Sequence, residues 1–299
     1  MVVLVTGANG QLGQSIKFIS KNYLDIDFVF CDSTVLDITN LDNVTQIFEQ
    51  FKPNFCINTA AYTAVDKAES EPEKAHLINV VGAKNLALVC KEYDTILLHV
   101  STDFVFDGDS SFVGMTNGYT ELDIPNPTGV YGQTKLDGEK AIQAILDTYF
   151  IIRTSWVYSQ FGNNFMKTML RLASERDTIY VVNDQIGSPT NAVDLAQVLI
   201  NIICHTERSR SAHNKGFEIN NFGIYNFSNE GKCSWYEFAL KIFEVNNLKI
   251  NVQPIPTSNY PTPAKRPSFS VLDKTKIKST FKIDIKSWEE SLKTIIFPL

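Results

Sequence analysis

The sequence predicts an α/β fold: a doubly wound parallel sheet with a smaller C-terminal region. Short apolar runs alternate with amphipathic helical patterns, which is how a parallel sheet and its crossover helices are arranged along a chain. A glycine-rich turn directly follows the first apolar run and precedes a helical pattern, as is typical of nucleotide-binding sheets. The 299 residues suffice for such a core and a second region beside it.

The strands and helices are expected as follows. Strand candidates are residues 2–5, 28–30, 55–58, 96–100 and 150–153, and amphipathic helices are expected over 41–51 and 75–93. Capping boxes at 234–237 and 287–290 mark two later helix starts. The polar stretch 205–216 is predicted to be a surface loop, and the proline-rich stretch 254–267 an ordered irregular segment beside the ligand. We therefore expect a dinucleotide-binding domain over residues 1–155, rejoined by about 191–230, and a mainly substrate-binding region over 156–299.

Composition and charge exclude several classes of protein. A formal net charge of -6 with mixed signs lacks the basic stripe that a nucleic-acid partner requires. No apolar run approaches the ~18 residues of a membrane span, and the chain opens into an apolar strand without a basic leader. These two observations predict a cytoplasmic location. The five cysteines are odd in number and scattered, which predicts reduced thiols in the core. A homodimer is left open.

The first motif with a chemical meaning is the turn from Thr6 to Gly13, whose spacing is GxxGxxG with Gly7, Gly10 and Gly13. Such glycines permit a tight turn and close approach of the backbone to a pyrophosphate, as in Rossmann-like folds. Asp32 falls 19 residues after Gly13, at the end of the second strand. An acid there accepts hydrogen bonds from adenosine ribose hydroxyls, although a turn aspartate is the alternative.

Other polar or small residues follow the strands at the same edge of the sheet. Asp37 or Thr39 either caps the next helix or contacts adenine. The small residues of 58–63 would let a cofactor lie close to the backbone, or simply suit helix–sheet packing. Residues 101–103 end another strand. Because ligands bind beyond the carboxyl ends of the strands in doubly wound sheets, all these stretches are expected to line one crevice.

Tyr131 and Lys135 are four residues apart and therefore share one helix face. A phenol titrates near pH 10, and a neighbouring ammonium is expected to bring its pKa toward working pH. The pair is thus a candidate acid–base device at the rim of the crevice. The alternative is a surface helix that carries both residues by chance.

Gly7–Gly13, Ser101–Thr102 and Tyr131–Lys135 together resemble the extended short-chain dehydrogenase/reductase superfamily. More narrowly, the chain resembles the dTDP-4-dehydrorhamnose reductase family. The stretches that carry this narrower resemblance extend nearly from end to end: 58–69, 101–106, 153–158, 162–165, 182–190 and 260–267. It implies reduction of the C4 keto group of dTDP-4-dehydrorhamnose to give dTDP-L-rhamnose, with NADPH or NADH as cofactor.

The resemblance also implies roles for individual residues. Tyr131 would protonate the C4 oxygen, Lys135 would tune Tyr131 and hold the nicotinamide ribose, and Thr102 would hydrogen-bond the same carbonyl. The implied cofactor contacts are Gly7, Gly10, Gln11, Leu12, Gly13, Asp32, Asp37, Ile38, Ala61, Tyr62, Thr63, Val100, Tyr131 and Lys135. The implied substrate contacts are Thr102, Asp103, Trp156, Asn163, Asn164 and Arg266. Trp156 is equally well explained as a core aromatic, and Arg266 as a structural arginine.

Some positions depart from relatives. Ser15 and Val193 stand where some relatives carry acids that bind a metal between subunits, so no metal site is expected. The four histidines, His76, His99, His205 and His213, lack metal-ligand spacing and receive no role.

Phe104 stands where related dehydratases place a glutamate base. A phenyl ring cannot take up a proton, which favours reduction over elimination. Two alternatives to the reductase are another nucleotide-sugar epimerase or reductase, and a non-catalytic regulatory subunit that binds the cofactor. The presence of Thr102, Tyr131 and Lys135 weighs against the regulatory subunit.

Overall fold

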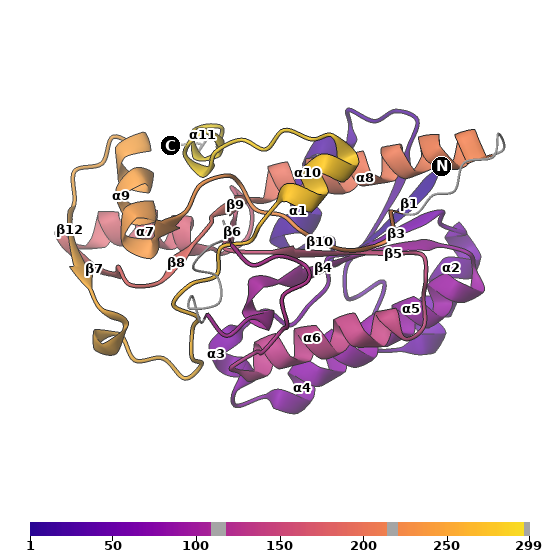
Figure 1. Ribbon diagram of the computed structural model, residues 1–299, viewed down its shortest axis with the longest axis horizontal. Helices are drawn as coiled ribbons and strands as arrows, with labels where there is room; N and C mark the ends of the chain where they lie inside the picture. The colour runs from indigo at the N-terminus through magenta and orange to yellow at the C-terminus, as the bar shows by residue number, and fades with distance from the viewer. Residues whose placement is uncertain (109–117, 214–220, 296–299) are drawn as a thin grey trace.

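The computed structural model describes residues 1–108, 118–213 and 221–295. A six-stranded sheet lies at its centre, with helices on both faces (Figure 1). All of its strands are parallel. In spatial order they are β10 (Gly223–Asn226), β5 (Tyr149–Thr154), β4 (Ile96–Thr102), β3 (Phe55–Asn58), β1 (Val2–Thr6) and β2 (Asp27–Cys31). The predicted α/β fold with a doubly wound parallel sheet is confirmed.

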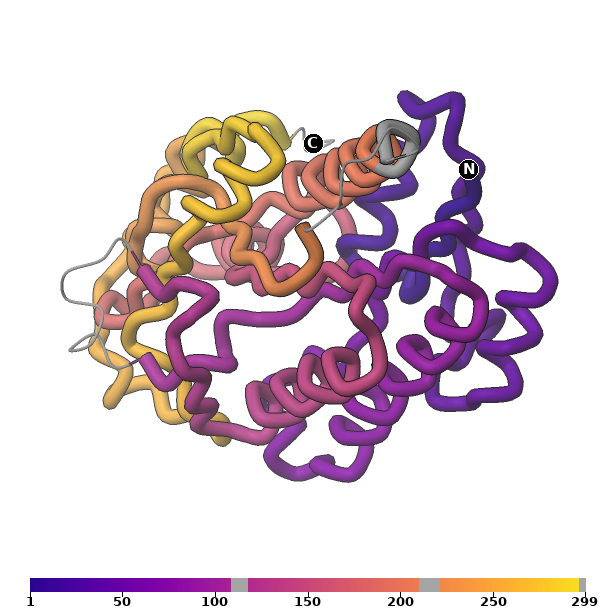
Figure 2. Tube along the Cα trace, turned by 45° about the vertical axis from the view of Figure 1, so that its right-hand side comes forward, coloured from indigo at the N-terminus to yellow at the C-terminus, as the bar shows by residue number. Residues whose placement is uncertain are grey.

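The sheet is buried on both faces, so its strands read as continuous apolar runs. Successive side chains alternate between two cores: Val3 and Val5 face one, and Leu4 faces the other. The first core is closed by α1 (Gln11–Ser20), α8 (Ala192–His213) and α10 (Thr275–Phe281). The second is closed by α2 (Leu41–Phe51), α5 (Gly82–Glu92) and α6 (Val130–Gln143). Figures 1 and 2 show α10 lying alongside α8 on the first face.

The five expected strands are all present, up to two residues longer than predicted, and helix 41–51 has the predicted bounds. The single helix expected over 75–93 is instead α4 (Pro72–His76), a π-helical segment η1 (Leu77–Val81), and α5. This segment packs closely against α6, where a Cβ on Gly138 would lie 2.2 Å from the carbonyl oxygen of Asn79. The glycine therefore allows the contact between the two helices.

The C-terminal part is built from small strand pairs and helices around a third core. The pairs are β6 (Val157–Tyr158) with β9 (Thr190–Asn191), β7 (Thr178–Val182) with β12 (Asn251–Ile255), and β8 (Ile186–Gly187) with β11 (Cys233–Ser234). Its helices are α7 (Phe165–Glu175), α9 (Trp235–Val245) and α11 (Trp288–Lys293). Both predicted capping boxes are formed, at Ser234–Glu237 and Ser287–Glu290.

Two predictions about loops need correction. Residues 205–213 are not a loop, because α8 continues to His213; residues 214–216 lie outside the described part. The polar side chains are accommodated inside the helix: Thr206 Oγ1 donates to the Ile202 carbonyl at 2.8 Å, and Ser209 Oγ donates to the His205 carbonyl at 3.0 Å. In the proline-rich stretch, Pro254 and Ile255 belong to β12, and a 3-10 turn η3 (Thr257–Asn259) follows.

Candidate active site

A cleft of about 410 Å³ opens beyond the carboxyl ends of β1, β2 and β3. Strand β2 lies on one side of β1, and the next strand in sequence, β3, lies on the other side. Ligands of doubly wound sheets usually bind where the strand order reverses in this way. Its lining residues are Gly7, Asn9, Gly10, Asp32, Ser33, Thr34, Leu36, Asp37, Ile38, Thr39, Thr59, Ala60, Ala61 and Ile78.

The glycines of the first turn make this cleft a backbone cradle. Gly7 has φ +62°, and a Cβ there would lie 2.7 Å from the backbone nitrogen of Ala60. A Cβ on Gly13 would lie 2.6 Å from the Gly7 carbonyl oxygen. Helix α1 begins directly after Gly10, so its N-terminus faces the cleft. The glycines leave room for the pyrophosphate of a dinucleotide, which larger residues at these positions would fill. The N-terminus of α1 also favours a negatively charged group.

Asp32 lies at the end of β2 and lines the cleft. One carboxylate oxygen accepts hydrogen bonds from the Thr34 backbone at 2.9 Å and the Thr34 hydroxyl at 2.6 Å, and the other accepts from Asn9 Nδ2 at 2.6 Å. The bonds from Thr34 are the main reason that the pKa of Asp32 is lowered. Asp32 can therefore be both a turn aspartate and a ligand for the adenosine ribose, since the turn holds an ionised carboxylate at the cleft.

The stretch after β2 also faces the cleft, through Asp37, Ile38 and Thr39. Neither Asp37 nor Thr39 caps helix α2, so that alternative was wrong. The cap is Asn40, whose side chain accepts a hydrogen bond from the Asn43 backbone at 3.1 Å. Asp37 Oδ1 instead accepts from the Thr39 hydroxyl at 2.7 Å and shapes the preceding turn.

Of the other predicted cofactor residues, some line the cleft and some do not. Ala61 lines the cleft, but Tyr62 and Thr63 are outside its lining. The Tyr62 hydroxyl donates to Glu71 Oε2 at 2.9 Å, and Thr63 is exposed. The Leu12 side chain belongs to the core beneath α1.

The candidate catalytic groups meet where β4 ends. Thr102 is the last residue of β4, Asp103 begins the 3-10 turn η2 (Asp103–Val105), and Tyr131 lies in the first turn of α6. The Thr102 side chain is near enough to the Tyr131 hydroxyl to favour its ionised form slightly, and so to lower the pKa of Tyr131 against the larger effect of burial. Thr102 Oγ1 also donates to Asp103 Oδ1 at 3.1 Å. Gly132 permits this approach, because a Cβ there would lie 2.1 Å from the carbonyl oxygen of Phe104.

The electrostatics of this group differ from the prediction. Burial raises the pKa of Tyr131 to about 12, and the nearby Asp103 carboxylate adds to the rise. Lys135 does not offset it, because its Nζ extends to β4, where it donates to the Val100 carbonyl at 2.8 Å and lies 3.2 Å from His99 Nε2. The expectation that Lys135 brings the pKa of Tyr131 toward neutrality was therefore wrong for this structure. The phenol is held protonated.

Lys135 itself is buried, with 2% of its surface exposed. The alternative of a surface helix that carries both residues by chance is therefore excluded. Burial lowers the pKa of Lys135 to about 8, and the Glu139 carboxylate opposes that shift.

Asp103 is almost fully buried beside Tyr131 and Thr102. Burial raises the pKa of its carboxyl group to about 6, although the nearby Ser270 side chain and the hydrogen bond from Thr102 oppose the rise. Within the described residues, its Oδ2 atom has no hydrogen-bond partner. A buried carboxyl oxygen that is left free in this way is available to a ligand hydroxyl.

The predicted substrate residues of the C-terminal part have structural partners. Asn164 caps α7 by accepting from the Lys167 backbone at 3.1 Å, and its Nδ2 donates to Gln11 Oε1 at 2.7 Å. Gln11 Nε2 in turn donates to the Val157 carbonyl at 3.1 Å. Gln11 thereby joins the start of α1 to the C-terminal part. Asn163 is exposed.

Trp156 and Arg266 are both engaged by neighbouring residues. Trp156 has φ +45° and stacks on Trp235, with ring centroids 3.5 Å apart. This agrees with the core-aromatic interpretation. Arg266 forms a two-pronged ion pair with Asp66, with nitrogen–oxygen distances of 3.0 and 2.7 Å. The pair ties the end of the proline-rich segment to α3 (Val65–Ala68), as the structural-arginine alternative expects.

His99, which received no role from the sequence, and Asn58, expected only as part of the stretch 58–63, form a hydrogen-bonded pair near the site. His99 is 1% exposed and lies 3.2 Å from Lys135 Nζ. Asn58 Nδ2 lies 2.9 Å from the other ring nitrogen of His99. A signal was present, since His99 interrupts a buried apolar strand three residues before Thr102, and a polar residue in such a strand needs a partner.

The two positions considered for a metal, Ser15 and Val193, have contacts within the chain. Ser15 Oγ donates to the Gln11 carbonyl at 2.9 Å, and Val193 packs against the first core. Across residues 1–108, 118–213 and 221–295, no group of three or more His, Cys, Asp or Glu side chains is arranged to hold a metal ion. All five cysteines are free thiols. In the described part of the chain, no helix combines the length and apolarity needed to cross a membrane.

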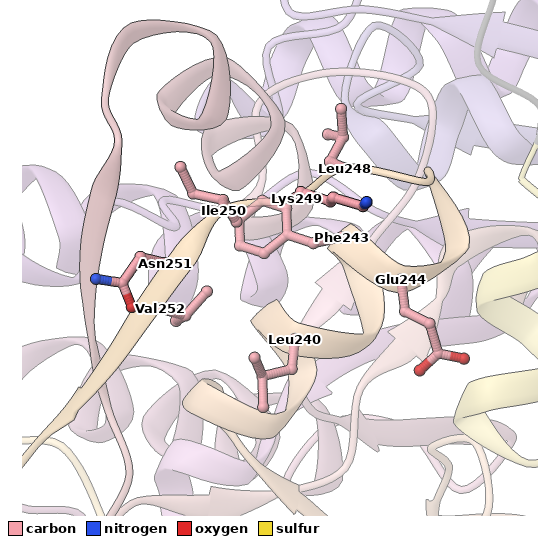
Figure 3. A pocket seen from close by; sticks show the side chains of 8 residues that line it. All are labelled: Leu240, Phe243, Glu244, Leu248, Lys249, Ile250, Asn251 and Val252. Atoms are coloured by element: carbon pink, nitrogen blue, oxygen red, sulfur yellow. The ribbon is translucent and has the colours of Figure 1, made fainter.

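A separate groove of about 550 Å³ lies between α9 and β12 (Figure 3). It is lined by Leu240, Phe243, Glu244, Leu248, Lys249, Ile250, Asn251 and Val252. These elements lie at the opposite end of the molecule from α2 (Figure 1), so the groove is not part of the cleft.

Comparison with known proteins decides the family. Residues 1–299 match the model of the family described as RmlD substrate binding domain. The chain belongs to this family. A dTDP-4-dehydrorhamnose reductase of Aggregatibacter actinomycetemcomitans is 43% identical over 300 residues, which cover 98% of this chain and 97% of that protein. The resemblance noted in the sequence is confirmed.

Solved structures of RmlD relatives agree with this assignment. A crystal structure of a dTDP-4-dehydrorhamnose reductase from Clostridium acetobutylicum is 40% identical, with a TM-score of 0.88. A structure of the reductase from Bacillus anthracis, in complex with NADP, is 41% identical with a TM-score of 0.86. Each comparison covers 98% of this chain and 97% of the other. The RmlD match therefore includes both the cleft and the group around Tyr131.

Proposed function

We propose that this protein reduces the C4 keto group of dTDP-4-dehydrorhamnose to give dTDP-L-rhamnose, with NADPH or NADH as the reductant. The observation that carries the proposal is that Tyr131, in the first turn of α6, lies beside Thr102 at the end of β4. It places two hydroxyl groups together at the same sheet edge as the dinucleotide cleft. The names of the 43% identical relative and of the two solved reductases support the choice of substrate.

Residues of the cleft would hold the cofactor. Gly7, Gly10 and Gly13 would lie against its pyrophosphate, and Asp32 would accept hydrogen bonds from the adenosine ribose. When bound, the reduced nicotinamide supplies the hydride for C4 of the sugar. We further propose that residues 1–155 with about 191–230 form the cofactor-binding part, and that 156–299 form mainly the substrate-binding part.

Tyr131 would give its proton to the C4 oxygen as negative charge develops there. The phenol is protonated at neutral pH and so has a proton to donate, and the negative charge that develops on the C4 oxygen draws that proton from it although burial makes it a weak acid. Thr102 would donate a second hydrogen bond to the same oxygen, which stabilises the transition state more than the neutral ketone. Asp103 would accept a hydrogen bond from a sugar hydroxyl through its free oxygen.

We also propose that the protein acts in the cytoplasm. Five free cysteines, four of them buried, support this, because free thiols persist where the environment is reducing.

The direct test follows oxidation of NADPH and NADH after addition of dTDP-4-dehydrorhamnose. The wild-type protein should oxidise one reduced cofactor per sugar, whereas Tyr131→Phe should not do so at a comparable rate. Tyr180→Phe is a matched control, because Tyr180 is 64% exposed on β7. Tight cofactor binding without any turnover of this sugar would instead favour a different substrate or a regulatory role.

A further inference from the structure

Helix α6, which carries Tyr131, begins without a capping side chain of its own. Its N-cap residue is Gly129, which has no side chain to accept a hydrogen bond from the first turn. The first backbone N–H groups of a helix have no acceptor inside the helix, so an acceptor must come from elsewhere. Glu69 supplies one, because its Oε1 accepts from the Val130 backbone at 2.9 Å across 61 positions of the sequence.

Gly129 leaves the space that this contact requires. Its backbone is extended, with φ -146° and ψ 169°, a conformation that any residue adopts, so the backbone does not require glycine. A Cβ at this position would lie 2.7 Å from Glu69 Oε1, which is too close for the carboxylate to stay where it is. The missing side chain at Gly129 therefore explains how a residue of another helix can cap α6.

Apolar packing also joins the start of α6 to the residues around Glu69. Ala68, which precedes Glu69, is fully buried in a small apolar cluster, and Val130 and Tyr131 pack against that cluster. Tyr131 directly follows the residue whose N–H is bound by Glu69. A shift of the helix start would therefore move the Tyr131 side chain with it.

Glu69 can hold α6 only if its own helix, α3, is held as well. Asp66 of α3 accepts hydrogen bonds from Arg266 at 3.0 and 2.7 Å and from the Ala264 backbone at 3.3 Å. These contacts fix α3 to the proline-rich segment. On its other side, α3 follows residues 59–61, which line the cofactor cleft. The Glu69 carboxylate thus extends from an element that is tied at both ends.

We propose that Glu69 is a positioning residue for Tyr131. Its carboxylate caps α6, fixes the start of that helix and thereby directs the phenol to the site beside Thr102. The partial positive charge at a helix N-terminus strengthens a contact with a carboxylate. The effect of Glu69 on turnover rests on the proposed function, whereas its effect on the position of Tyr131 does not.

Kinetics of variants at the two positions test the effect on turnover. Glu69→Ala should lower kcat by about tenfold with the KM of the cofactor within about twofold of wild type, because misplacing an acid by about 1 Å costs up to about 10²-fold. Glu69→Gln should keep kcat within about threefold of wild type, since an amide oxygen also accepts from the Val130 backbone. Gly129→Ala should resemble Glu69→Ala, and the double variant should be no slower than either single one, because both changes remove the same contact.

Ser287→Ala is the matched control for loss of a helix cap. Ser287 caps α11 in the C-terminal part by accepting from the Glu290 backbone at 3.2 Å, so its loss should lower the melting temperature and leave kcat unchanged. Glu69 is exposed, so its variants are expected to fold. An unchanged kcat in Glu69→Ala, an equal loss in Glu69→Gln, or an equal loss in Ser287→Ala would overturn the proposal.

NMR of protein labelled with ¹⁵N-valine and ¹³C-tyrosine tests the position of Tyr131 without any substrate. Loss of one signal in Val130→Ile and of one in Tyr131→Phe assigns the Val130 amide and the Tyr131 ring. We expect both signals to shift in Glu69→Ala and Gly129→Ala, and the Tyr131 signal to stay in place in Glu69→Gln and Ser287→Ala. An unchanged Tyr131 signal in Glu69→Ala would overturn the proposal. If the expected shifts occur but the wild type does not reduce dTDP-4-dehydrorhamnose, the proposed function fails and the positioning role stands.

Discussion

The Phe104 ring lies edge-on to the Tyr131 ring, with centroids 5.6 Å apart and planes at 72°. The resemblance described for the sequence implies that Phe104 takes the position of a glutamate base in related dehydratases, and a phenyl ring cannot abstract the proton at sugar C5. We predict that the protein does not dehydrate dTDP-glucose. Incubation with dTDP-glucose and oxidised cofactor, followed by a search for the 4-keto-6-deoxy product, checks this. Formation of that product at enzymatic rates would mean that another residue acts as the base.

Tyr131→Phe should lower turnover by about 10²-fold or more, since this is the usual scale for loss of a positioned acid. Cofactor affinity and thermal stability should stay near the wild-type values, because only one hydroxyl is removed. Steady-state kinetics measure turnover, a titration measures cofactor affinity, and a melting curve measures thermal stability. Turnover within a fewfold of wild type would remove Tyr131 from the mechanism.

Asp103→Asn should stabilise the protein at high pH more than at low pH. The pKa of Asp103 is about 6 in the folded protein, above the usual 3.8, so folding favours the protonated carboxyl. The contribution of the protonated Asp103 to stability is fully present below pH 4 and is lost as the pH rises through 6. The shift in the pKa of Asp103 corresponds to a change of about 3 kcal/mol in the free energy of unfolding.

The measurement for Asp103→Asn is the melting temperature against pH. The difference from wild type should widen from pH 4 to pH 8, because asparagine does not ionise. Exposed Asp25→Asn is the control for loss of a surface charge. A difference that is constant with pH would show that Asp103 is not held protonated by the fold.

Both cofactors should bind, with NADH well tolerated. Asp32 lines the cleft with an ionised carboxylate, and residues 31–40 contain no Arg or Lys. Asp32→Ser should weaken NADH binding by about tenfold or more, which is the loss of one hydrogen bond to a charged group, and should weaken NADPH binding less. Fluorescence titration measures both affinities, with Asp42→Ser on α2 as a surface control. Strict dependence of the wild type on NADPH would show that basic residues elsewhere bind the extra phosphate.

Local patterns predicted much of the fold. The bounds of α2 and both capping boxes follow from neighbours within a few residues, and the five strands follow from short apolar runs. The helix 205–213 was missed because its polar side chains suggested solvent, whereas Thr206 and Ser209 bond to carbonyls within the helix. The π-helical segment 77–81 depends on packing against α6, which spacing within one helix does not reveal.

The sequence predicted which residues form the candidate site, but it did not predict which side chains contact one another there. The cleft gathers Gly7, Asp32 and Ala61 as expected, because parallel strands end at the same edge. The partners of Lys135 could not be read from spacing, since a lysine side chain is long enough to reach β4 instead of its helix neighbour. Likewise, the pairing of Arg266 with Asp66 joins positions 200 residues apart.

The central claim is hydride delivery to C4 with Tyr131 as the acid, and one labelling experiment tests it most directly. The wild-type protein is given dTDP-4-dehydrorhamnose and reduced cofactor carrying deuterium at the transferable position of the nicotinamide, and the sugar product is examined by NMR. We predict dTDP-L-rhamnose with deuterium at C4, and almost none with Tyr131→Phe. Deuterium at another carbon, the C4 epimer as the main product, or equal labelling by Tyr131→Phe would contradict the account.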